Sequence, residues 1–196
     1  MTLRLGAGTS LFHSLMAAAL FVTFSVATAG CSGPVAAVSG DRLLPGVTYS
    51  ADLDGDKTAE TLTIDKKHGG LTIKDGKVVY HSRTKWTIVE ACLGDTDHSG
   101  LLEVVTLVDD TDGRHVGLFA YFGGEYRERL VTSEITPKPL EIDIVHLNLS
   151  GKPGDKPADD VGGDFIFVTQ EPPASQTQPL TSVWRWNGFS FTQVNP

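Results

Sequence analysis

The sequence predicts an all-β fold, built from β-hairpins, that follows an N-terminal signal peptide. After residue 40, short runs of β-branched and aromatic residues alternate with Gly, Asp and Asn turns. Long helical periodicity does not interrupt them. An apolar segment near the N-terminus indicates targeting. Because the chain has 196 residues, of which 40% are hydrophobic, one domain with its own core is expected.

The N-terminal segment has the pattern of a secretory signal peptide. An apolar run from Leu11 to Ala29 follows Arg4 and ends in small residues. A thin positive region, an apolar centre and a small-residue end are typical of such a peptide, so we assign residues 1–30 to it. A run of about 19 residues can also cross a bilayer, and a retained transmembrane anchor is the alternative.

The residue after this segment is a cysteine. Thr28-Ala29-Gly30-Cys31 resembles the lipobox of bacterial lipoproteins, in which the cysteine is lipidated and becomes the mature N-terminus. The resemblance implies a lipid anchor on Cys31 and an extracytoplasmic protein on the membrane of a bacterial cell envelope, with simple secretion as the alternative. Residues 31–46 begin with small, uncharged residues and predict a flexible tether. The folded domain is then expected over residues 47–196.

The expected strands follow one another along this domain. In the first of them Leu62 and Ile64 alternate with threonines, which places both on one face. Glycine turns at Asp75-Gly76, Gly123-Gly124 and Asn187-Gly188 each separate two runs and predict hairpins. Cys92 lies in an apolar run and is expected to be a small buried hydrophobe. The runs that we expect to form strands are 61–64, 71–74, 77–81, 86–93, 104–108, 116–122, 126–131, 142–147, 165–169, 183–186 and 189–194.

Two acidic loops share one plan, 43 residues apart, and an expected strand directly follows each. Residues 52–60 read Asp-Leu-Asp-Gly-Asp-Lys-Thr-Ala-Glu, and residues 95–103 read Asp-Thr-Asp-His-Ser-Gly-Leu-Leu-Glu. Both have oxygen-bearing side chains at positions one, three and five and a carboxylate at position nine. The candidate ligands are Asp52, Asp54, Asp56, Thr58 and Glu60 in the first loop, and Asp95, Asp97, Ser99, Leu101 and Glu103 in the second.

This spacing predicts a Ca²⁺ site in each loop. Alternate side chains of a tight loop point toward one centre, and the carbonyl at position seven, of Thr58 or Leu101, adds an oxygen to the six to eight that Ca²⁺ takes. The loops differ from an EF-hand, because residues 63 and 106, at position twelve, are threonines. A solvated acidic turn is the alternative, and Ser99 in place of a third acid predicts a weaker second site. We interpret a third unit, from His146 to Asp160, as a degenerate loop.

Loops of the form D-x-D-x-D-G-x-x-[DE] that open a repeat of short strands resemble those of the FG-GAP/VCBS family. Residues 184–191 resemble the last hairpin of bacterial members, and the resemblance covers residues 47–196. It implies four-stranded, propeller-like blades, with each metal loop between the outer strand of one blade and the inner strand of the next. Closed propellers usually need more blades than this chain has room for. We therefore expect about three propeller-like blades or an open stack of sheets, or half of an oligomer.

Charge and motifs limit the function classes. The formal net charge is −8, and because nucleic acid binding needs a basic face, no nucleic acid partner is expected. The sequence has no nucleophile elbow, phosphate-binding glycine loop or zinc-ligand spacing. We expect a non-catalytic binding or accessory module with a protein or glycan partner in the cell envelope. The alternative is a hydrolase acting on cell-wall polysaccharide, with Asp109, Asp110 and Asp112 as candidate acids.

Overall fold

The computed structural model describes residues 33–149 and 161–194. These two ranges contain thirteen β-strands and no helix, which confirms the all-β prediction. In the part of the chain that is described, there is accordingly no helix with the length and apolar character needed to cross a membrane. The expected signal peptide over residues 1–30 and the expected lipidation site, Cys31, lie outside the described residues.

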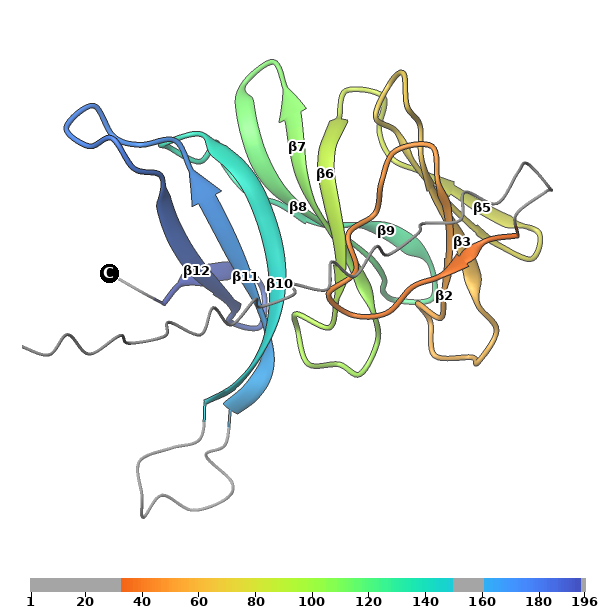
Figure 1. Cartoon of the computed structure of the whole chain (residues 1–196). Coiled ribbons are helices and arrows are strands. Elements are labelled where there is room, and N and C mark those ends of the chain that lie inside the picture. Colours follow the sequence, from red (N-terminus) through yellow and green to blue (C-terminus); the bar gives the residue numbers. More distant parts are fainter. Residues whose placement is uncertain (1–32, 150–160, 195–196) are drawn as a thin grey trace, which may run out of the picture. The chain divides into compact units, whose positions relative to one another are not determined.

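The strands form three open sheets in chain order (Figure 1). The first sheet has the order β1-β2-β3-β4-β5, in which β1 is parallel to β2 and the other neighbours are antiparallel. The second sheet, β6-β7-β8-β9, and the third, β10-β11-β12-β13, are antiparallel meanders. The strands are β1 (Val35–Ala36), β2 (Thr48–Ala51), β3 (Glu60–Ile64), β4 (Leu71–Asp75), β5 (Val78–His81), β6 (Thr87–Gly94), β7 (Glu103–Asp110), β8 (Gly113–Tyr121), β9 (Tyr126–Val131), β10 (Pro139–Leu149), β11 (Val161–Gln170), β12 (Leu180–Trp186) and β13 (Phe191–Gln193).

The second sheet is buried on both faces. On β7, Val104 and Val108 belong to a core cluster shared with the first sheet. Val105 and Leu107 belong to a second cluster, shared with the third sheet. Because successive residues of a strand point to opposite faces, this alternation places the first and third sheets on opposite faces of the second. A strand that is buried on both sides needs a nearly continuous apolar run, which β7 provides.

Most of the expected strands form close to their predicted bounds. Leu62 and Ile64 are buried on one face of β3, and Cys92 is buried on β6, as the sequence indicated. The three glycine turns join β4 to β5, β8 to β9 and β12 to β13. Strand β2 and the two-residue β1 were not expected, since β1 is too short to carry a period and β2 alternates over only four residues.

The expectation of a flexible tether over residues 31–46 is wrong from residue 33 onward. Strand β1 pairs with β2, and the N–H of Gly40 donates to a carbonyl of β6 at 2.8 Å. Leu43 is buried in the core, and Arg42 forms an ion pair with Glu90 on β6. Small residues were interpreted as a tether, but they also allow a chain to pack closely against a strand. The segment is therefore part of the fold.

The acidic loops lie within sheets, which corrects the placement that the family resemblance implied. Residues 52–59 connect β2 to β3 and residues 95–102 connect β6 to β7, and both strand pairs are hydrogen-bonded neighbours. A short loop can join two antiparallel neighbours of one sheet, which is what both acidic loops do. Glu60 and Glu103 are the first residues of β3 and β7. His146, the first residue of the degenerate third unit, lies in β10, and residues 150–160 of that unit lie outside the described residues.

Candidate metal centre

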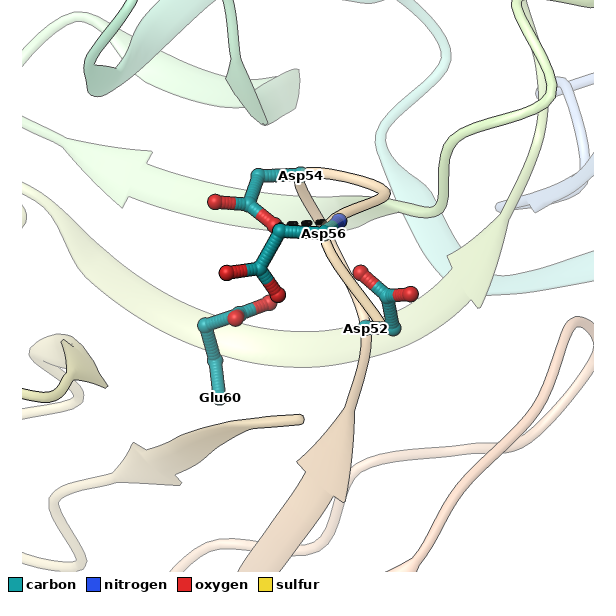
Figure 2. A group of neighbouring side chains, drawn as sticks. All are labelled: Asp52, Asp54, Asp56 and Glu60. Carbon is teal, nitrogen blue, oxygen red and sulfur yellow. Dashed lines mark hydrogen bonds between the residues drawn. The ribbon is translucent and has the colours of Figure 1, made fainter. Parts of the chain in front are cut away.

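The first acidic loop brings four carboxylates to one point (Figure 2). One oxygen from each of Asp52, Asp54, Asp56 and Glu60 lies within 4.8 Å of the oxygens of the other three. Thr58, the candidate carbonyl ligand, lies in the same loop and donates its N–H to Asp56 at 2.6 Å. The structure thus brings together all four acids that the sequence indicated for this loop.

Hydrogen bonds within the loop hold these side chains in place. Asp52 accepts the N–H of Gly55 at 2.7 Å and that of Lys57 at 3.0 Å. Asp54 accepts the N–H of Asp56 at 3.0 Å, the dashed line in Figure 2. Gly55 and Lys57 have left-handed backbone conformations, with φ of +81° and +71°. Because these two residues reverse the chain, it coils around the carboxylates.

Glu60 is the buried member of the cluster. It is 1% exposed, because the alternation of β3 points it inward together with Leu62 and Ile64. Its Oε2 accepts the N–H of Leu53 at 2.5 Å, whereas its Oε1 is buried and has no hydrogen-bond partner among the described residues. Burial, with the charge of Asp54 adding to it, raises the pKa of Glu60. Carboxylates this close repel one another, and their oxygens are the ligands that a hard cation such as Ca²⁺ takes.

A tyrosine from the second sheet adjoins the first loop, and the sequence did not indicate it. Tyr126 is buried at the start of β9, and its hydroxyl lies beside the carboxylate of Glu60. Burial raises the pKa of Tyr126, and the nearby charges of Glu60 and Asp54 raise it further. Its ring packs against Tyr121, with centroids 5.1 Å apart. The first loop therefore lies at the contact between the first and second sheets.

The second acidic loop repeats the backbone of the first. Asp95 accepts the N–H of Gly100 and Asp97 accepts that of Ser99, each at 3.0 Å. The acids at positions one and three of the first loop make the same two bonds. Positions four and six are again left-handed, with φ of +59° and +84°. Leu101, the candidate carbonyl ligand, donates its N–H to Ser99 at 3.3 Å. The two loops are a structural repeat.

A guanidinium lies among the acids of the second loop. Arg129 of β9 forms ion pairs through Nη1 with Asp97 and, at 3.2 Å, with Oε1 of Glu103. Burial opposes ionisation of Asp97, but hydrogen bonds from Arg129 and Ser99 outweigh it and lower its pKa. Burial raises the pKa of Glu103 to about 7, although Thr96 donates two hydrogen bonds to it. One arginine thus places a positive charge beside two acids of the second loop.

An aspartate of β11, Asp164, contacts His146, the first residue of the third unit. Asp164 is 5% exposed and accepts the hydroxyl of Ser39 and the N–H of Asp95 at 2.8 Å. Its Oδ1 lies 2.9 Å from Nδ1 of His146, the residue that stands where the other loops have their leading acid. Burial opposes ionisation of Asp164, but these hydrogen bonds outweigh it and lower its pKa. The remaining acids of the unit, at 155, 159 and 160, lie outside the described residues.

The acids considered for catalysis lie at the β7–β8 hairpin. Asp109 accepts two hydrogen bonds from Arg114, at 2.6 and 2.7 Å, and Asp110 pairs with His115 at 3.0 Å. The bond from Arg114 lowers the pKa of Asp109, and the N–H of Asp112 lowers that of Asp110. Both acids line a cleft of about 640 Å³. The structure therefore brings Asp109 and Asp110 together in one cleft, each paired with a basic side chain.

No known protein family, curated protein or solved structure matches this chain. The resemblance to the FG-GAP/VCBS family therefore rests on the residues of the two loops and the closing hairpin. Because a fold alone does not identify a function, the function is argued from the geometry of the first loop.

Proposed function

We propose that this protein is a non-catalytic calcium-binding module, anchored outside the cytoplasm to the membrane of a bacterial cell envelope. The group of four carboxylates around the buried Glu60 carries the proposal, because one oxygen of each lies within 4.8 Å of those of the other three. One cation among these carboxylates offsets their mutual repulsion. Ca²⁺ suits an all-oxygen ligand set with flexible geometry, and the FG-GAP/VCBS resemblance supports the same ion.

The role that we propose for the ion is structural. The first loop lies beside Tyr126 of the second sheet, so an ion there stabilises the contact between two sheets. Calcium sites of extracellular modules have dissociation constants of about 10⁻⁴–10⁻³ M. At millimolar calcium, a site in this range adds about 0.4–1.4 kcal/mol to the free energy of unfolding.

A lipid on Cys31 is the second part of the proposal, supported by the signal-peptide pattern and by the lipobox resemblance. Strand β1 begins at Val35, so three residues separate Cys31 from the first strand, and the four steps from residue 31 to residue 35 span about 14 Å at most. We therefore expect the domain to lie close to the lipid surface. Fractionation of cells that express wild type or Cys31→Ser tests the anchor. The wild type should stay with the membrane and the variant should not, whereas equal release of both indicates secretion.

A binding or accessory role needs a partner, and we propose a protein or glycan of the cell envelope, with a second copy of the chain as the other candidate. Phe189, at the turn between β12 and β13, is 81% exposed, and Phe122 is exposed after β8. Exposed aromatic side chains are common in contact surfaces, which supports a binding role.

Thermal unfolding of the chelator-treated protein, with and without about 5 mM Ca²⁺, tests the calcium site. We expect calcium to raise the Tm of the wild type by roughly 2–9 °C. Asp54→Ala should abolish this rise, because it removes one of the four clustered carboxylates. Asp112→Ala removes the same charge from an exposed turn and serves as the matched control. An equal rise in wild type and Asp54→Ala, or none in wild type, contradicts the proposal.

A further inference from the structure

The two acidic loops differ at one equivalent oxygen. Glu60 and Glu103 both stand at position nine, and in both the Oε2 atom accepts the N–H of position two, from Leu53 at 2.5 Å and from Thr96 at 2.9 Å. The Oε1 atom of Glu60 has no hydrogen-bond partner within the described chain. The Oε1 atom of Glu103 lies 3.2 Å from Nη1 of Arg129.

Arg129 is fixed in this position from several sides. Its side chain is 16% exposed, and the same Nη1 also forms an ion pair with Asp97. Its guanidinium carbon lies 4.7 Å from the ring centroid of Phe122 and 4.7 Å from that of Trp186. A planar guanidinium both stacks on aromatic rings and pairs with carboxylates, so the geometry suits arginine in particular. Two carboxylates and two aromatic rings therefore hold the guanidinium in one position.

We infer that Arg129 takes the place of a calcium ion in the second loop, so that this loop keeps its fold without metal. A guanidinium offers no oxygen ligand, and its positive charge repels a divalent cation at the same carboxylates. Nη1 contacts the acids at positions three and nine, Asp97 and Glu103, which a metal at this loop would need. The chain should then bind one calcium ion in total, and this number rests on the proposal that the first loop binds calcium.

The inference divides the fold into a part that responds to calcium and a part that does not. Glu60 lies on the face of β3 that packs against the second sheet. Glu103 shares a face of β7 with Val105 and Leu107, which pack against the third sheet. Trp186, the ring beside Arg129, belongs to that third sheet. Removal of calcium should therefore speed amide hydrogen exchange more in β2 and β3, which flank the first loop, than in β6 and β7.

Ser99 offers a competing explanation for the second loop, because it replaces the third acid of the first loop. The two explanations separate in a pair of variants. Ser99→Asp restores the acid and keeps the arginine, whereas Ser99→Asp combined with Arg129→Gln restores the acid and removes the arginine. If Arg129 excludes the ion, only the second of these variants gains a calcium site.

Isothermal titration with Ca²⁺ on full-length protein in detergent provides the test, with Asp54→Ala present throughout to remove the first site. We expect D54A and D54A/S99D to bind no calcium, and D54A/S99D/R129Q to bind one ion per chain. Binding by D54A/S99D, or no binding by the folded triple variant, overturns the inference. Near-ultraviolet circular dichroism checks that each variant is folded.

A fourth variant keeps the inference testable if the triple variant does not fold. Asp97→Asn in the wild-type background should leave the number of bound ions unchanged, because the second loop holds none. A loss of one ion in this variant overturns the inference even when the first loop binds as proposed. Failure of the first loop has a different signature: the wild type then binds no calcium, while the comparison of D54A/S99D with the triple variant stays valid.

Discussion

Arg129 contacts Glu103 through an Nη1–Oε1 distance of 3.2 Å, and the equivalent oxygen of Glu60 has no such partner among the described residues. The two loops thus have the same backbone, but only in the second does an arginine contact the glutamate at position nine. The second loop has a cation supplied by the chain, and the first has the geometry of a site for a dissolved ion. The response to calcium is therefore expected to be local, although the sequence pattern is repeated.

Glu103 should make stability depend on pH. Its pKa is about 7 in the folded chain, because it is buried, against 4.5 for an ordinary glutamate. The folded state then holds a proton that the unfolded state has released, so this contribution to stability is complete below pH 4.5 and is lost as the pH rises toward 7. The shift corresponds to about 3 kcal/mol. We compare the unfolding free energies of wild type and Glu103→Gln in the presence of chelator. The value for wild type minus that for the variant should fall by about 3 kcal/mol between pH 4.5 and pH 7. A constant difference contradicts the assignment.

Asp164 should be a strong structural determinant. Its carboxylate accepts hydrogen bonds from Ser39 and from the N–H of Asp95, and it pairs with His146. Asp164→Ala removes the acceptor of three part-buried hydrogen bonds and should lower the unfolding free energy by about 1–3 kcal/mol in urea titrations. The exposed Asp112→Ala should change it by less than about 0.5 kcal/mol. Equal effects of the two substitutions show that the Asp164 contacts contribute nothing.

Cys92 should be unreactive in the native protein. It is buried on β6, and burial raises the pKa of its thiol to about 12. Because the thiolate is the reactive form, iodoacetamide at about pH 8 should leave Cys92 unmodified until denaturant is added. Peptide mass spectrometry reads out the modification at this residue independently of Cys31. Rapid native alkylation indicates that β6 opens readily.

Tyr126 should report ion binding optically. Its hydroxyl adjoins the Glu60 carboxylate, and terbium replaces calcium at oxygen sites and accepts energy from a nearby excited tyrosine. Tyr126→Phe should therefore lower tyrosine-sensitised terbium emission while it leaves the terbium affinity within about threefold. Tyr80→Phe, on β5 of the first sheet, is the control and should keep the emission. Equal emission from both variants places the ion away from Tyr126.

The strands were predictable because their signals are local. Leu62 and Ile64 alternate with threonines, and each glycine turn stands between two apolar runs, so strand faces and hairpins follow from neighbouring residues. Strand β1 was missed because two residues carry no period. Its segment is held by contacts such as that of Arg42 with Glu90, 48 residues away, which no local pattern reports.

The first site was predictable for the same reason, since its four acids lie in one nine-residue loop. The occupant of the second loop was not, because Arg129 lies 32 residues from Asp97 and 26 from Glu103. Tyr126 likewise reaches the first loop from another sheet. Periodicity shows which side of a strand is buried, and it does not show which distant side chain meets that side.

The number of calcium ions bound per chain tests the central claim most directly. Equilibrium dialysis of the full-length wild type at about 1–5 mM Ca²⁺, with Asp54→Ala as the paired variant, gives this number. We predict one ion per wild-type chain and none for the variant. No bound ion in the wild type, or equal binding by Asp54→Ala, would contradict calcium binding at the first loop.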